Sequence, residues 1–399
     1  MRSGTEVTKT DLTALISMLF LFPGTFFYQS LVGLGYIPAF AGGYFGIASA
    51  AVFLVLAARY SYLTLKTGRV QTFDALYFGF LFYFAFIALF NAFVVGKEGY
   101  LAWHIGSVIQ CAAVYMIFKG IAKGSKGIMT FSWLSITAMT IFIFAMSENG
   151  VFSVSAISGN KEAVSSYQGF ALNYMLIAII AIVNTRSRAI RLAAHPVFAL
   201  ALYMNGARSE FVAFLMFAIL FEVCKSHFKM LSTIAAASIL SIAGAMLYSG
   251  VIDIPENRVT TLLNLSENNS AQLRNKLSES GLSKIIENPI LGDYGNYDKG
   301  YYIHNILSAW LDLGFFGFIY LTSLIFIPMI MIGFRVALKR NSNTQNSFMF
   351  ASMFSCFILL VAGKYFTYLM VPAVLGYYAA ASRHPCRDSM QGEDEAITR

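Results

Sequence analysis

Two arginines and one histidine are the side chains whose types and positions could support group-transfer chemistry. Arg208 lies in a short polar turn between two apolar runs, and Arg274 and His304 lie in or beside the long polar stretch from Val251 to Tyr302. Arginine binds phosphate or pyrophosphate bidentately and stabilises it as it leaves. An imidazole of near-neutral pKa can take a proton from an attacking hydroxyl, which contributes about 10²- to 10⁴-fold to a rate. The three residues predict anion binding combined with general-base catalysis.

The segment around Arg274 has the pattern of an amphipathic helix from Ala271 to Glu287. At about 100° per residue, Arg274 falls in the middle of its apolar arc. A guanidinium there needs an anionic partner or a wet cavity, because burying it unpaired costs several kcal/mol. The alternative is that Arg274 snorkels and only anchors an interfacial helix. The apolar arc comprises Leu273, Leu277, Gly281, Leu282, Ile285 and Ile286.

The chain then passes through breaks at Pro289 and Gly292 and a stretch rich in Tyr and Gly before it reaches His304. His304 and Asn305 are expected to open a short helix that ends near Gly314. His304 is the one histidine predicted in an outward loop, and it is the best-placed general base in the chain. The alternative is an imidazole that only hydrogen-bonds to a loop carbonyl.

Arg208 lies in the turn from Asn205 to Glu210, which is expected to face outward. A basic residue on that side departs from the usual charge distribution of membrane proteins. Glu210 either neutralises Arg208 or orients it, and the alternative is that Arg208 is only an anchor at a helix end. Asp293 and Asp298 are five residues apart in a flexible stretch, so we expect neither a dedicated metal site nor a cofactor.

The elements that hold these residues are predicted to be membrane helices. Of the 399 residues, 57% are hydrophobic and only 12% are charged, and the mean hydropathy is +0.64. Soluble domains carry roughly 25% charged residues. Apolar runs of the about 20 residues needed to cross a bilayer recur from Leu12 almost to the C-terminus. We expect an all-α, polytopic bundle of about twelve spans, centred near residues 22, 48, 84, 108, 137, 175, 197, 217, 240, 324, 355 and 373.

The distribution of basic residues predicts the orientation of this bundle. Nineteen of the 28 Lys and Arg residues fall in connections on the side of the termini, whereas the opposite short loops hold only Lys97, Lys161, Arg208 and Lys364. Short cytoplasmic loops are enriched in Lys and Arg, so both termini are expected in the cytoplasm. The net charge of +8 comes from basic residues that are scattered between the spans. They therefore indicate the membrane topology and not a nucleic-acid-binding surface.

The predicted organisation is one integral membrane domain, residues 1–382, followed by a disordered cytoplasmic tail, residues 383–399. Within the domain, residues 251–303 form a long outward loop, and a loop of this length is uncommon unless it is functional. A shorter polar segment from Ser147 to Ser165 faces the same side.

In these residues the sequence resembles the superfamily of O-antigen polymerases and O-antigen ligases, which are bacterial envelope glycosyltransferases. Eight residues separate Asn305 from Gly314, where many members, ligases especially, have one more, and one residue rotates a helix by about 100°. This departure favours the polymerase branch. The resemblance spans roughly Asn205 to Gly317, and three matches carry it: Gly206 to Ser209 as Gly-x-Arg-Ser, Arg274 followed by Asn288-Pro289-Ile290-Leu291-Gly292, and His304-Asn305-Ile306-Leu307 leading through Asp312-Leu313-Gly314 to Gly317.

The resemblance implies a metal-independent, inverting glycosyl transfer from an undecaprenyl-pyrophosphate donor at the periplasmic face of a bacterial inner membrane. Arg208 and Arg274 would bind the pyrophosphate, and His304 would activate the acceptor hydroxyl. Asn305, Tyr301 and Tyr302 are expected to contact the substrate. The expected partners are the lipid-linked oligosaccharide, the bilayer and a chain-length regulator protein, with no nucleic acid.

Three functions are compatible with these patterns. The first is a polymerase of O-antigen or capsule type that joins lipid-linked repeat units. The second is a ligase that moves the glycan to lipid A-core or to a protein, so that only the acceptor differs. The third is a flippase or transporter, although transporters tend to place ionisable residues within their spans. Here the candidates are few: Asp74, Glu222 and Lys364.

Overall fold

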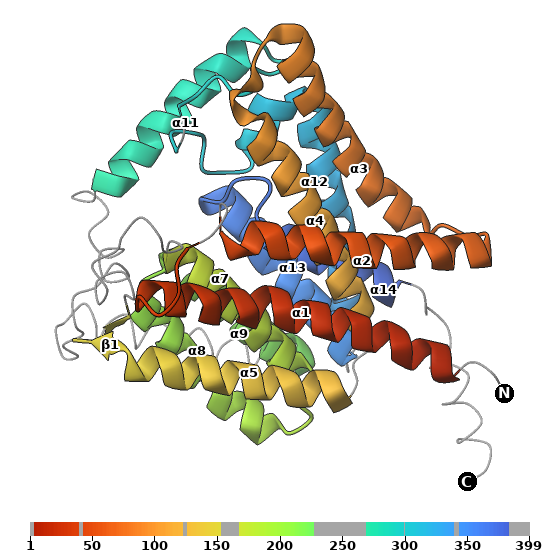
Figure 1. The fold of residues 1–399 in the computed structure, drawn as a ribbon, viewed down its shortest axis with the longest axis vertical. Coiled ribbons are helices and arrows are strands. Elements are labelled where there is room, and N and C mark those ends of the chain that lie inside the picture. Colours follow the sequence, from red (N-terminus) through yellow and green to blue (C-terminus); the bar gives the residue numbers. More distant parts are fainter. Residues whose placement is uncertain are drawn as a thin grey trace.

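Helices dominate the computed structural model, which describes residues 4–39, 43–122, 126–152, 167–226, 269–298, 300–338 and 343–382 (Figure 1). Described helices cover eleven of the twelve predicted centres, and the centre near residue 240 lies outside the described residues. The α-helices are α1 (Gly4–Gly33), α2 (Tyr44–Thr67), α3 (Thr72–Phe90), α4 (Leu101–Ile121), α5 (Lys126–Ala145), α7 (Tyr167–Val183), α8 (Arg188–Asn205), α9 (Arg208–Lys225), α11 (Asn269–Glu287), α12 (Leu307–Leu338), α13 (Thr344–Ala362) and α14 (Met370–Ala381).

Within the described residues, seven helical segments are long and apolar enough to cross a membrane. Two further apolar helices, α7 and α14, are shorter. Such a set of helices is typical of a polytopic membrane protein. The seven segments are Leu12–Gly33, Tyr44–Thr67, Thr72–Val95, Glu98–Ile121, Lys126–Ala145, Leu307–Leu338 and Thr344–Ala362.

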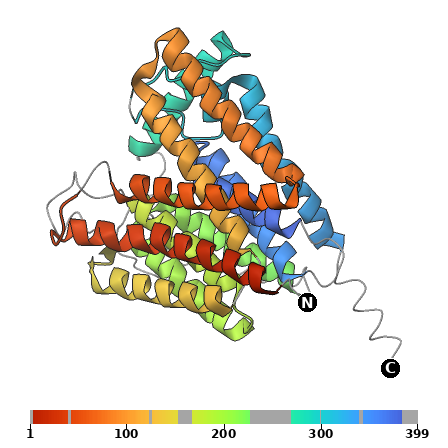
Figure 2. The same cartoon turned by 45° about the vertical axis from the view of Figure 1, so that its right-hand side comes forward.

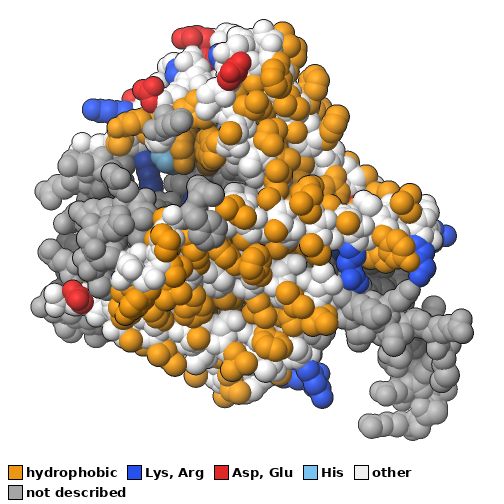
Figure 3. All heavy atoms as spheres, in the orientation of Figure 1, with side chains coloured by type: hydrophobic (Ala, Val, Ile, Leu, Met, Phe, Trp, Pro, Cys, Tyr) orange, Lys and Arg blue, Asp and Glu red, His pale blue; other side chains and the backbone are white. Residues whose placement is uncertain are grey.

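The outer surface of these helices is apolar. Figure 3 shows hydrophobic side chains over much of the visible face, including the upper right edge, where α3 runs. On α3, Phe82 is 76% exposed, and Phe93, in the π-helical turn that continues it (Asn91–Val95), is 74% exposed. Large aromatic side chains are rarely left in water in such numbers. Their exposure fits a surface that contacts lipid tails.

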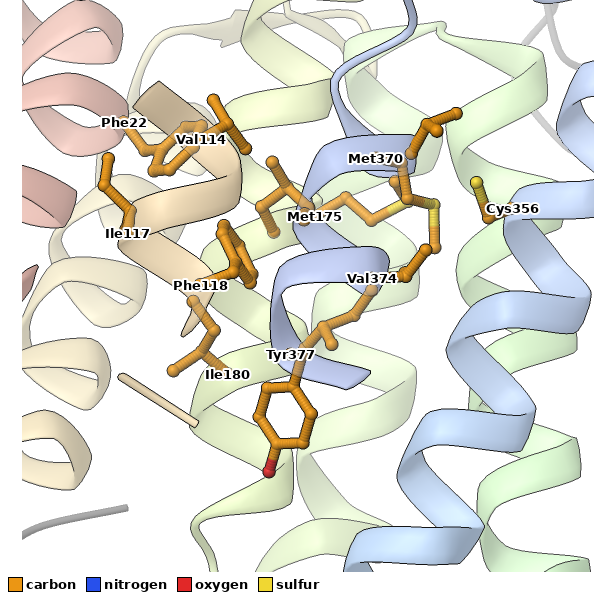
Figure 4. Packing of buried hydrophobic residues seen from close by; sticks show 14 of the residues in the cluster. Phe22, Val114, Ile117, Phe118, Met175, Ile180, Cys356, Met370, Val374 and Tyr377 are labelled. Carbon is orange, nitrogen blue, oxygen red and sulfur yellow. The ribbon is translucent and has the colours of Figure 1, made fainter. Parts of the chain in front are cut away.

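The interior is built by close helix packing, with α4 and α14 as its centre. Figure 4 shows Phe118 of α4 pointing toward α14, whose Val374 and Tyr377 lie nearby, while Met175 of α7 closes the cluster. At Gly376 a Cβ atom would lie 2.2 Å from the carbonyl oxygen of Tyr115, so only glycine permits this approach. Small residues at such crossings are how membrane helices gain packing contacts, because lipid supplies little hydrophobic driving force.

In the part of the chain that the structure describes, the expected all-α class is interrupted by a small hairpin, β1 (Ser147–Glu148) paired antiparallel with β2 (Val151–Phe152). Its turn is Asn149-Gly150, and both residues have positive φ (51° and 75°). An Asn-Gly pair favours the tight turn that joins two strands. This signal was present in the sequence, within the segment that we expected to be an outward loop. The rest of that segment, from residue 153 to 166, is outside the described residues.

Helix α12 is broken at Gly314, where φ is 70° and ψ is 179°. The expected short helix ending near Gly314 is thus present as Leu307–Leu313, but the chain resumes its helix directly afterwards. The break opens the hydrogen bond that would join Phe315 to Leu311. The Phe315 N–H instead donates to the carbonyl of Ile290 (3.0 Å), and the Leu311 carbonyl accepts from the Asp293 N–H (2.7 Å). The loop segment is therefore hydrogen-bonded to α12 at its break, and these two opened backbone groups find new partners in the loop.

Candidate functional site

Arg274 lies in helix α11, which packs on the helical bundle. The helix begins at Asn269, close to the predicted Ala271, and ends at the predicted Glu287. Figures 1 and 2 show it beside α12 and the turn between α3 and α4. Its Ile285 is buried against Ile303 and Leu311, and a Cβ atom at Gly281 would lie 2.1 Å from the side chain of Ile303.

Only part of the predicted apolar arc of α11 contacts the protein. Leu273, Leu282 and Ile286 are 45%, 45% and 69% exposed, whereas Ile285 is 2% exposed. The helix lies at the edge of the molecule, so one flank of the arc packs on the bundle and the other faces outward. An amphipathic helix in a membrane interface presents such an apolar flank to the lipid. The exposed flank continues into the loop with Ile290 and Leu291.

Arg274 and His304 converge at Gly363, the residue after α13. A Cβ atom on Gly363 would lie 3.4 Å from Nη1 of Arg274 and 3.8 Å from the carbonyl oxygen of His304. Arg274 is half-buried, and its charge lowers the pKa of His304. The guanidinium thus faces the protein, in the direction that the reading of Arg274 as an anion-binding residue requires.

His304 lies outside the membrane-spanning segments and is half-buried. Burial lowers its pKa from the usual value, and the positive charges of Arg274 and Lys364 lower it further. A hydrogen bond to the backbone carbonyl of Gly300 acts in the opposite direction. Because that carbonyl accepts from one ring nitrogen, the other is left with the lone pair in the neutral form. The bond to a loop carbonyl, expected for a purely structural histidine, is therefore present, and it also prepares the ring to accept a proton.

Lys364 is a charged residue of this region that sequence reasoning did not assign to the site. It directly follows Gly363 and is buried, with its Nζ paired to Oε1 of Glu210 at 2.5 Å. The hydroxyl of Tyr368 also donates to this Oε1 (3.0 Å), and Ser209 donates to Oε2 (2.9 Å). The signal that could have identified Lys364 was its position in a turn predicted to face outward, the same departure from the expected charge pattern that singled out Arg208.

Arg208 is the first residue of α9 and is half-buried. Glu210, two residues later, is fully buried and holds Lys364. Glu210 was expected to neutralise or orient Arg208, and the structure shows it in an ion pair with Lys364. Arg208 thus lies two residues before the carboxylate that binds Lys364, on the same first turn of α9.

Tyr301, Tyr302 and Asn305 differ in their surroundings. Tyr302 lies against His304, with ring centroids 4.4 Å apart, and burial raises its pKa. Tyr301 is 55% exposed and points away from the protein interior. The side-chain oxygen of Asn305 accepts from the Leu307 N–H (2.9 Å), so it caps α12. This bond gives Asn305 a role in holding the start of α12 next to His304.

A second polar cluster, centred on Asp312, joins the loop to the bundle. This aspartate is fully buried in α12. It accepts hydrogen bonds from the Gly295 N–H (3.0 Å) and the Tyr297 hydroxyl (2.9 Å), and also from the Tyr365 hydroxyl. The ring of Tyr365 in turn lies 4.8 Å from that of Tyr302. In the sequence, Asp312 stands out only as part of the motif that resembles the family.

His104 of α4 extends this cluster, since its two ring nitrogens contact the hydroxyls of Tyr294 (2.7 Å) and Tyr365 (3.0 Å). At the outer edge of the loop, Lys97 pairs with Asp293 at 2.7 Å. The loop after α11 is therefore held by side chains from α4, α12 and the α13–α14 connection. One of the two carboxylates considered for a metal is used in an ion pair.

Buried charges are more numerous than the sequence suggested. Asp74 of α3 is paired with Lys119 of α4, and Arg191 of α8 binds Glu222 of α9 through both Nε and Nη2 (2.8 and 3.2 Å). The number of these charged groups within the helices favours the transporter hypothesis more strongly than the sequence alone did. Their close pairing between neighbouring helices is what a static cross-link requires, because an unpaired buried charge is costly.

Figure 3 shows a histidine next to a Lys or Arg side chain in a hollow, below the region of α11 and beside the grey atoms. A basic recess of this kind can bind an anion next to a proton acceptor.

Comparisons with known protein families, with curated proteins and with solved structures found no match.

Proposed function

We propose that this protein is a membrane glycosyltransferase of the surface-polysaccharide polymerase type. It would transfer glycan from undecaprenyl pyrophosphate to the hydroxyl of a lipid-linked repeat unit at the periplasmic face of a bacterial inner membrane. The observation that carries the proposal is the convergence of Arg274 with His304 beside a third basic residue, Lys364. The resemblance of the motifs that contain Arg208, Arg274 and His304 adds the substrate class.

The chemistry follows from the charges in the site. His304 is neutral at pH 7, because burial and two cations oppose its protonation. Its free nitrogen takes the proton of the acceptor hydroxyl as the oxygen attacks the anomeric carbon of the donor. The bond from this carbon to the pyrophosphate oxygen breaks, and the leaving group carries away the electron pair. Arg274, with Arg208 at the start of α9, stabilises the negative charge of the leaving pyrophosphate.

The decisive test is elongation by the purified, full-length protein in lipid nanodiscs. The protein is incubated with lipid-linked repeat units and EDTA, and the glycan products are separated by length. We expect longer products from the wild type in the presence of EDTA, and none from His304→Ala. His304→Gln, which keeps the size and a hydrogen-bond donor but provides no base, should be equally inactive. Elongation that requires a divalent ion would contradict the metal-independent part of the proposal.

The ligase alternative is resolved by the acceptor and the deletion phenotype. Loss of a polymerase leaves single repeat units on the lipid A-core, whereas loss of a ligase leaves the core bare and the polymer on its lipid carrier. Transport would be favoured if Arg208, Arg274 and His304 could each become Ala without lowering the length or the amount of surface glycan.

A further inference from the structure

We propose that Lys364 is a third anion-binding residue of the donor site, kept next to Arg274 by Glu210, and that the site therefore selects a diphosphate over a monophosphate. The inference deepens the proposed function and rests on it in one respect, namely that the anion is the diphosphate of the lipid donor. The carrying observation is that two cations act on the same histidine. Nη1 of Arg274 approaches Gly363, Lys364 directly follows this glycine, and both positive charges lower the pKa of His304.

Lys364 and its partner Glu210 are both buried. The side chain of Lys364 is 7% exposed and that of Glu210 is 0% exposed, so both were removed from water when the protein folded. Such a pair contributes little to stability, because desolvation offsets much of the attraction. The Lys364–Glu210 pair differs from the Lys119–Asp74 pair in its place, because the charge of Lys364 acts on His304 together with that of Arg274, at the edge of the proposed anion site.

The partners of Glu210 allow Lys364 to change its contact. The carboxylate also accepts hydrogen bonds from Tyr368 and Ser209. If the ammonium turned toward an anion, Glu210 would keep these two hydroxyl donors. Lys364 lies in the non-helical connection between α13 and α14, with its Nζ 4.9 Å from the ring centroid of Tyr368. The flexible lysine stem permits such a rotation about a fixed backbone.

The charge of the cluster explains the selectivity. Arg274 and Lys364 are cationic and Glu210 is anionic, so the three groups sum to one positive charge while His304 is neutral. A monophosphate can be bound by Arg274 alone. A diphosphate carries a second anionic group that can compete with Glu210 for Lys364. After glycosyl transfer the lipid diphosphate is released from the same contacts.

Binding of inorganic pyrophosphate and of orthophosphate to the full-length protein in nanodiscs tests the inference without turnover. Isothermal titration should show tighter binding of pyrophosphate. In Lys364→Met we expect its Kd to rise by about tenfold or more, the loss of one charge-assisted hydrogen bond. The Kd of orthophosphate should change by less than about threefold. Lys364→Arg, which keeps the charge, should retain most of the pyrophosphate affinity.

Two further variants separate binding from folding. Lys364→Met leaves Glu210 buried without its ammonium partner, so the double variant Lys364→Met with Glu210→Gln, which removes both charges, is measured beside it. Lys119→Met is the matched control, because Lys119 is also a little-exposed lysine (10%) paired with a buried carboxylate, Asp74, which accepts hydrogen bonds from the hydroxyls of Tyr60 and Tyr115. This control should leave pyrophosphate binding by the folded protein unchanged.

The outcomes distinguish this inference from the proposed function. Loss of pyrophosphate affinity in Lys364→Met and in the double variant supports the anion site. If the wild type elongates no glycan in the same experiments, only the proposed glycosyl transfer is contradicted. Unchanged pyrophosphate affinity in the folded double variant overturns the inference, even if the wild type elongates glycan. A wild type that binds the two anions equally tightly, or binds neither, also overturns it.

Discussion

The backbone of Gly292 lies against the backbone of Gly314, at the point where α12 is broken. A Cβ atom on Gly292 would lie 2.4 Å from the carbonyl oxygen of Leu311, and one on Gly314 would lie 2.5 Å from that of Ile290. Both glycines have a φ near +70°. Two motifs of the sequence, Asn288 to Gly292 and Asp312 to Gly314, are thus one structural unit that places the loop above α12.

Replacing either glycine with alanine should destabilise this unit. The Cβ atom would clash with backbone, and a left-handed φ costs a non-glycine residue about 1–2 kcal/mol even without a clash. We expect Gly314→Ala to lower the midpoint of thermal unfolding in detergent and to increase proteolysis within residues 288–303. Gly106→Ala is the control, because nothing lies within 4 Å of its Cβ position. Equal unfolding midpoints and equal proteolysis in the two variants would contradict the close backbone packing of the loop against the break in α12.

The acid limb of the pH–rate profile should report His304. Its pKa is lowered by burial and by Arg274 and Lys364, so the active, neutral form persists to a lower pH than for an ordinary histidine. Removing a nearby positive charge with Lys364→Met raises the pKa of His304. At a fixed acidic pH more of the ring is then protonated, and the acid limb of kcat/KM should move to higher pH.

The control for this profile is Lys276→Ala, an exposed cation on α11. It should leave the acid limb in place. If Lys364→Met retains measurable activity with an unshifted limb, then the titrating group is not His304.

Arg274 should be needed for donor binding through its fork geometry. Arg274→Ala removes charge-assisted hydrogen bonds worth roughly 1.5–3 kcal/mol each, or about 10- to 100-fold in affinity. The measurement is the KM for the lipid-linked donor in the elongation assay. Arg274→Lys should recover only part of the loss, because lysine cannot bind bidentately. An unchanged KM in Arg274→Ala would contradict donor binding by Arg274 and favour the alternative that it only anchors an interfacial helix.

Asp312 should hold the loop and not react. Asp312→Leu leaves the Gly295 N–H and the hydroxyls of Tyr297 and Tyr365 without their acceptor, and each buried unsatisfied group costs about 1–3 kcal/mol. We expect faster amide exchange in residues 293–303 and a loss of activity that follows this loosening. Tyr297→Phe, which removes one donor, should show a smaller change in the same residues. Unaltered exchange in Asp312→Leu would contradict the role of Asp312 in fastening the loop.

Composition and hydrophobic periodicity determined the class of the fold, because a chain that buries its backbone in lipid must pair its polar groups within helices. The amphipathic pattern predicted α11 to within two residues, and Gly314 was recognised as the end of a helical segment. These features depend on neighbours in the chain, so their signals are local.

The sequence by itself also singled out Arg274 and His304, since a guanidinium in an apolar arc and an imidazole in a loop predicted to face outward are unusual in type and place. Only the tertiary structure decided that Glu210 binds Lys364, 154 residues away, and that Tyr365 and Asp312 fasten the loop beside His304. Packing against Ile303 and Leu311 likewise decided which flank of α11 faces the rest of the protein. Such pairings depend on which helices lie side by side, and the periodicity of a single helix contains no information about its neighbours.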